Sequence, residues 1–240
     1  MSSELTPNPP PIDVAAEPQI AVQNYPPVHG IIPAVEAILR EPGRIGATLR
    51  ERGHGRLILA PLSVAVFCAI VYGLVVGTFS AGQQLWAAPL KVAVGLLISG
   101  LICLPSLYIF SCLSGSPVRL AQVFGFLAGL LALSAILLIG FAPVAWVFSA
   151  STESVAGMGA LHLLFWIVAT WFGLRFLIGS LRQFGPKSPE AVKVWAIIFI
   201  LVQLQMMTAL RPLIGKSDTF FPQEKKFFIA HWVDCMTKRK

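Results

Sequence analysis

Five long apolar runs dominate the pattern of hydrophobic and polar positions along the chain. They cover about residues 57–77, 88–113, 120–148, 158–181 and 192–210, and none of them contains Asp or Glu. A helix needs about 20 apolar residues to cross the hydrocarbon core of a bilayer. Backbone groups in lipid must be paired within their own segment, so continuous runs of this kind indicate helices. The pattern therefore predicts an all-α fold, a polytopic membrane helix bundle with about five transmembrane helices.

Polar segments flank these runs. Residues 1–30 are rich in proline and poor in large apolar side chains, which predicts a disordered cytoplasmic tail. Residues 31–56 place apolar side chains at helical spacing before a series of arginines, which indicates an amphipathic segment on the membrane surface or a solvated basic linker. Residues 57–215 form the predicted bundle. Residues 216–240 form a C-terminal tail, with a short amphipathic helix predicted over 223–237.

Composition supports a membrane location. Only 12% of the 240 residues are charged and 56% are hydrophobic, whereas soluble domains are about 25% charged. The net charge of +7 comes from basic residues beside apolar runs. Basic and aromatic residues are not interleaved in any polar segment, so we expect the lipid bilayer as a partner and no nucleic acid.

The distribution of basic residues predicts the orientation. The segment before the first run contains five arginines, and the second and fourth connections contain Arg119, Arg182 and Lys187. The first and third connections contain no Lys or Arg. Since cytoplasmic loops carry the excess of basic residues, we expect the N-terminus in the cytoplasm, in a bacterial cytoplasmic membrane. Five spans place the basic C-terminal tail outside, against this rule, so the side of that tail stays open.

Few polar side chains interrupt the apolar runs. The basic residues within or directly after these runs are Lys91, Arg175, Lys193 and Arg211, all near helix ends, where snorkelling to the headgroups explains them. Arg175 is the deepest of the four and the best candidate for an internal contact. Pro212 cannot donate a backbone hydrogen bond and should end the fifth helix. Arg211 then lies at exposed helix carbonyls, which favour a cation.

Several uncharged residues are candidates for contacts between helices. Gln203 and Gln205 in the fifth run predict interhelical hydrogen bonds, with a polar pore lining as the alternative. Gly125 and Gly129 form a G-x-x-x-G motif, which permits close helix approach. His162 is a lone histidine, so a packing role is expected, with haem or chlorophyll ligation as the alternative.

Motifs for catalysis and metal binding are missing from the sequence. It contains no nucleophile elbow, HExxH motif or phosphate-binding loop. The cysteines form no CxxC pair. We therefore expect no enzyme activity, no cofactor and no metal site.

Short segments of the chain resemble a family. They are residues 38–44 (ILREPGR), 57–62 (LILAPL), 102–108 (ICLPSLY), 141–144 (FAPV) and 210–215 (LRPLIG), followed by Phe220-Phe221 and Phe227-Phe228. With a short helix before five spans, they resemble uncharacterised bacterial members of the Yip1-domain superfamily over most of residues 31–236. The resemblance implies a cytosolic N-terminus, five spans and an exported C-terminus. Eukaryotic relatives bind small GTPases and assist vesicle traffic, and no residue here carries that role.

Three hypotheses about function follow. The leading one is a non-enzymatic membrane scaffold or accessory subunit, with a protein partner or a homo-oligomer in the membrane. The alternative is a channel or transporter for a small solute or ion, indicated by Arg175, Gln203, Gln205 and Arg211. The lack of intramembrane carboxylates argues against coupling to protons or sodium. A pigment- or haem-binding subunit using His162 is the third hypothesis.

Overall fold

The computed structural model describes residues 31–40, 54–80, 84–151, 155–182, 185 and 190–209. The predicted disordered tail at 1–30, the roles of Arg211 and Pro212, and the predicted helix at 223–237 lie outside these residues. The helices are α1 (Ile31–Arg40), α3 (His54–Ser80), α4 (Gln84–Leu113), α5 (Leu120–Ser151), α6 (Val155–Arg182) and α7 (Glu190–Ala209).

The predicted all-α bundle is confirmed. In the described part of the chain, α3 to α7 are long and apolar enough to cross a membrane, over Ile58–Phe79, Leu85–Leu113, Leu120–Ser151, Gly157–Arg182 and Glu190–Met207. These spans agree with the predicted apolar runs to within three residues at each end. The architecture is that of an integral membrane protein.

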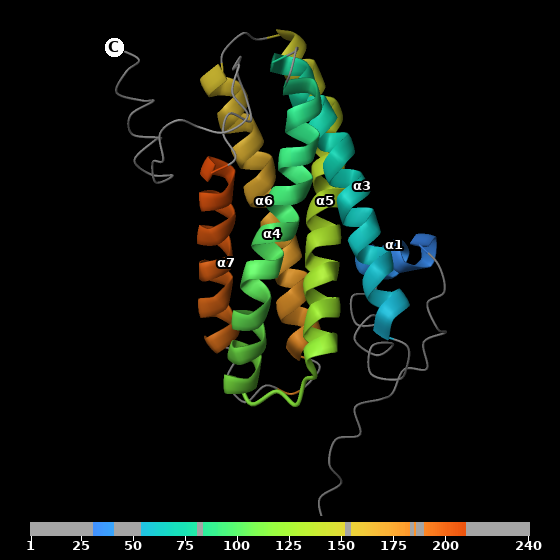
Figure 1. The fold of residues 1–240 in the computed structure, drawn as a ribbon, viewed down its shortest axis with the longest axis vertical. Coiled ribbons are helices and arrows are strands. Elements are labelled where there is room, and N and C mark those ends of the chain that lie inside the picture. The colour runs from blue at the N-terminus through green and yellow to red at the C-terminus, as the bar shows by residue number, and fades with distance from the viewer. Residues whose placement is uncertain are drawn as a thin grey trace, which may run out of the picture.

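Helix α5 lies at the centre of the bundle and contacts α3, α4 and α6, while α7 packs mainly on α4 at one side (Figure 1). Within an 18-residue window of each span, the share of residues buried inside the bundle is 72% for α5 and 28% for α7. We call the end where α3 and α5 finish and α4 and α6 begin the upper end, and the end where α4 and α6 finish and α5 and α7 begin the lower end, as Figure 1 draws them. In that view α7 stops short of the upper end.

The lower connection between α4 and α5 is fixed by local hydrogen bonds. Gly115 has a φ of 77°, a conformation that glycine adopts without a steric cost. The Gly115 N–H donates to the Cys112 carbonyl (2.9 Å) and the Ser116 N–H to the Ser111 carbonyl (3.3 Å), which is the Schellman pattern of a helix end. The Arg119 N–H then donates to Gln122 Oε1 (2.8 Å) and so caps the start of α5. The connection therefore sets the antiparallel packing of the two helices.

Small residues bring the helices close together around α5. Gly125 and Gly129, the predicted close-approach motif, are both buried on α5. A Cβ atom at Gly129 would lie 2.6 Å from Cε1 of Phe176 on α6. The Phe176 ring thus occupies the space that a side chain at Gly129 would need, so Gly129 lies in the contact between α5 and α6.

Helix α1 is short and amphipathic, and it lies crosswise beside the lower part of α3 (Figure 1). Ile38 is buried in the core that α3 and α5 share. Glu36 and Arg40 are on its exposed side, where Arg40 Nη1 lies 3.7 Å from Glu36 Oε1. The helical spacing predicted for residues 31–40 is present, and the helix packs on the bundle through Ile38.

Candidate functional site

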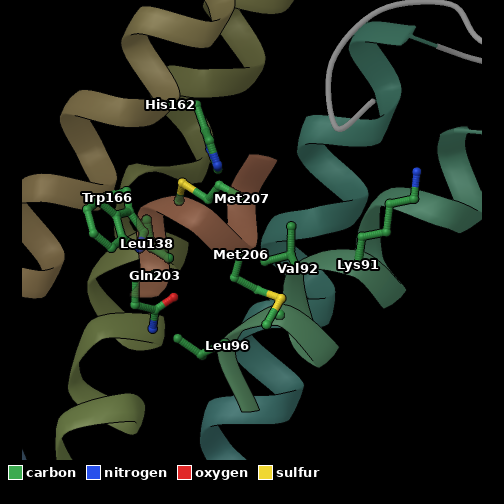
Figure 2. A pocket seen from close by; sticks show the side chains of 10 residues that line it. Lys91, Val92, Leu96, Leu138, His162, Trp166, Gln203, Met206 and Met207 are labelled. Atoms are coloured by element: carbon green, nitrogen blue, oxygen red, sulfur yellow. The ribbon is translucent and has the colours of Figure 1, made fainter. Parts of the chain in front are cut away.

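A cavity of about 40 Å³ lies in the upper half of the bundle, where α4, α5, α6 and α7 meet (Figure 2). Its lining residues are Lys91, Val92, Gly95, Leu96, Leu138, His162, Trp166, Gln203, Met206 and Met207. They come from the first part of α4 and α6 and from the last part of α5 and α7. Because neighbouring helices run in opposite directions, these parts share one end of the bundle.

Three polar side chains from three different helices line this cavity. Lys91 on α4 is 2% exposed, His162 on α6 is 7% exposed and Gln203 on α7 is 4% exposed. All three lie within candidate membrane spans. In Figure 2 the stem of Lys91 runs along the wall, and its amine points away from Gln203 and Met206.

His162 is held in place by Tyr72 from α3. The Tyr72 hydroxyl lies 2.9 Å from His162 Nδ1, and the two rings stack with their centroids 5.5 Å apart and their planes 16° apart. Tyr72 is fully buried. The contact fixes the orientation of the imidazole and leaves Nε2 as the atom that can bind a ligand.

The wall formed by α7 combines one amide with two thioethers. Gln203, Met206 and Met207 are spaced by three and four residues, so they lie on one face of α7. All three line the cavity. In Figure 2 the Met207 side chain extends from α7 toward the His162 ring on α6. The face thus presents polarizable sulfur atoms and one amide to an otherwise apolar space.

The structure separates the residues that the sequence singled out. His162 and Gln203 line the cavity, whereas Gln205 is half-buried and does not. Arg175, the best candidate among the four basic residues for an internal contact, is exposed. It lies about two turns from the end of α6 at Arg182, within snorkelling reach of that end. Lys91, for which snorkelling was also expected, is instead buried.

Tyr72 is the site residue that sequence reasoning missed. A tyrosine in a membrane span carries a hydroxyl that needs a hydrogen-bond partner when buried. That requirement could have drawn attention to Tyr72, but only the fold pairs it with His162, which is 90 residues away in the chain.

Among the described residues, no three His, Cys, Asp or Glu side chains come together to hold a metal ion. No family model, curated protein or solved structure matches the chain. The arrangement brings an imidazole, an amide and two thioethers to one small cavity. Such a site can bind a small polar molecule or an ion.

Proposed function

We propose that the chain is a membrane channel or transporter for a small solute or ion, and that the cavity in its upper half is the binding site. The observation that carries this proposal is the convergence of buried Lys91, His162 and Gln203 from three spans on one cavity. Ionisable side chains inside a membrane commonly mark a substrate or ion path.

The cost of these side chains supports a functional role. A lysine at the centre of a membrane helix costs about 2.5–3.5 kcal/mol on insertion scales. Lys91 lies at the start of the third turn of α4 and not in the middle of the helix, yet it is buried. Lys193 on α7, by contrast, is exposed, and its Nζ atom lies 2.7 Å from Glu190 Oε1. Packing alone does not require a buried lysine at that position, since an apolar side chain would fill the same wall.

The size of the cavity restricts the ligand. A water molecule needs about 10–15 Å³ of such space, so a cavity of about 40 Å³ holds roughly three waters. This size favours an ion or a very small solute. It does not favour a haem or chlorophyll bound through His162, because a macrocycle is far larger.

The orientation belongs to the same proposal. With the N-terminus in the cytoplasm of a bacterium, α3 begins at the cytoplasmic side and the upper half faces outward. The cavity would then be reached from outside the cell. The Yip1-like resemblance implies the same orientation, with five spans and a cytosolic N-terminus.

Flux measurements test this function. The full chain in proteoliposomes should conduct or exchange a small ion or solute, and Lys91→Met should change the rate at least several-fold. Lys193→Met is the matched control, because Lys193 is exposed, and it should leave the rate unchanged. Equal rates in the wild type, both variants and empty liposomes, for every ion and solute tested, would contradict the proposal.

A scaffold or accessory subunit, the leading hypothesis from the sequence, is the second candidate here and is supported by the outer face of α7. Val194, Ile197 and Leu201 are between 49% and 60% exposed and lie at helical spacing on one face. Lipid or a partner helix can cover such a face. Extraction in gentle detergent from the native membrane should then recover a stoichiometric partner or a homo-oligomer, and Ile197→Trp should weaken that association. A partnerless monomer would contradict this candidate.

A further inference from the structure

One exposed face of α6 is basic in its lower half. Trp171, Arg175, Gly179 and Arg182 follow one another at spacings of three and four residues, which places them on the same face of the helix. All four are exposed. Arg175 is therefore not an isolated charge on this face, because a second arginine follows it two turns farther toward the lower end.

We propose that Arg175 and Arg182 bind the phosphate group of an anionic phospholipid in the leaflet at the lower end of the bundle. Gly179 leaves room for the headgroup between them, and the acyl chains lie along the apolar part of the same face. None of these three residues lines the cavity. The lipid site is therefore independent of the transport function proposed above.

The spacing of the two arginines suits a single phosphate group. Arg175 and Arg182 are about 10 Å apart along the helix axis, and Gly179 lies about one turn from each of them. A Cβ atom at Gly179 would meet nothing within 4 Å, so the surface is open at this level. The two long arginine side chains can reach this level from either side.

The chemistry of the two side chains selects an anionic lipid. Guanidinium groups bind phosphate through paired hydrogen bonds, and two of them can share one phosphate. Among the described residues, neither Arg175 nor Arg182 forms an ion pair with a carboxylate, whereas Lys193 at the same end is paired with Glu190. Two unpaired positive charges favour a lipid of net negative charge over a zwitterionic one, because they repel the cationic headgroup of the zwitterionic lipid.

The upper part of the same surface of α6 suits the acyl chains. Leu164, Ile167 and Trp171 are between 51% and 63% exposed, and they belong to the candidate span Gly157–Arg182. An amphiphile matches such a surface, since its phosphate meets the arginines while its chains cover the apolar side chains. A bound phosphate also lowers the cost of placing the charge of Arg175 within a membrane span.

The test measures lipid binding by the purified full-length chain in detergent. Phosphatidylglycerol is the probe, phosphatidylcholine with the same acyl chains is the reference, and native mass spectrometry counts the bound lipids at each lipid concentration. The wild type should bind phosphatidylglycerol more tightly. A basic residue near an anionic membrane surface contributes about fivefold to binding, so Arg175→Gln and Arg182→Gln should each weaken phosphatidylglycerol binding about fivefold.

Two controls separate a defined site from general attraction. Arg119→Gln removes the same charge at the same end of the bundle, where Arg119 is exposed beside the start of α5, and it should leave lipid binding unchanged. Gly179→Leu keeps the charge and fills the space between the arginines, so it should weaken binding several-fold. Gly140→Leu, on α5, also adds a side chain in open space and should bind lipid as the wild type does.

Three results would overturn the proposal. The first is equal affinity of the wild type for the two lipids. The second is an equal loss of affinity in Arg119→Gln and Arg175→Gln, which would mean attraction without a site. The third is wild-type binding by Gly179→Leu. Melting temperatures without added lipid check the fold of every variant, and they should be unchanged because all the substituted residues are exposed.

Discussion

The two ends of α7 differ in what they do. Near its start, Trp195 and Phe199 are fully buried and stack with their ring centroids 5.2 Å apart. Near its end, Gln203, Met206 and Met207 line the cavity. The same helix therefore closes the bundle with aromatic packing at the lower end and presents polar and sulfur side chains to a space at the upper end.

Hydrogen bonding sharpens this contrast. Trp195 Nε1 donates to the Cys103 carbonyl and to Ser106 Oγ on α4, both at 3.1 Å. Its polar atom is thus satisfied within a dense core. In the upper half, Lys91, His162 and Gln203 line a space. We infer that the lower half supplies stability and the upper half supplies the site, and each prediction below tests that division.

The largest expected effect is the loss of stability in Trp195→Ala. Deleting a buried tryptophan side chain costs about 3–5 kcal/mol of unfolding free energy, and Trp195 also joins α7 to α4. Thermal unfolding in detergent measures the change. Trp171→Ala is the control, because Trp171 is 63% exposed, and it should change stability by less than about 0.5 kcal/mol. Equal losses in the two variants would contradict the assignment of stability to the lower half.

The second effect concerns the contact between α5 and α6 at Gly129 and Phe176. Gly129→Leu forces a side chain against the Phe176 ring, and overpacking of this kind costs about 1–3 kcal/mol. Gly140 on the same helix has open space around its Cβ position, so Gly140→Leu is the matched control. Melting temperatures in the same detergent give the comparison. A Gly129→Leu variant that keeps the wild-type melting temperature would show that α5 and α6 pack less tightly at this position than the structure implies.

The sequence was sufficient to predict the membrane helices and their approximate bounds. A run of about 20 apolar residues without a carboxylate has few alternatives to a membrane helix, and the predicted runs match the spans of α3 to α7. The G-x-x-x-G motif predicted a close approach between helices, but the partner of Gly129, Phe176 on α6, is known only from the fold. Local patterns decide where the membrane helices lie, so a sequence can reveal them.

The site was predicted only in part. His162 and Gln203 stood out as polar residues in apolar runs, but nothing in the sequence showed that they share a cavity. The contrast between exposed Arg175 and buried Lys91 shows why the sequence was not enough. Both lie about two turns from a helix end, and only the packing of neighbouring helices decides which side chain reaches the headgroups and which is buried. The pairing of Tyr72 with His162 likewise depends on the contact between α3 and α6.

A third, smaller effect separates stability from binding. Tyr72→Phe and Trp195→Phe each remove one hydrogen-bonding group and keep an aromatic ring, and the loss of the hydrogen bond costs about 1 kcal/mol. Tyr72→Phe also removes the hydrogen-bond partner of His162, a residue that lines the cavity, so it should change flux through the proposed path, whereas Trp195→Phe should not. Flux of both variants in proteoliposomes measures this, and parallel changes in flux would mean that the two halves are not independent.

The smallest effect on stability is expected for Gln203→Leu. Polar contacts between membrane helices contribute about 0.6 kcal/mol on average, so the melting temperature should change little. The amide is part of the cavity wall, however, and its loss should lower flux through the proposed path. Gln205→Leu is the matched control, because Gln205 is on the same helix and does not line the cavity. If both variants lower flux equally, the cavity does not lie on the path, since only one of the two amides faces it.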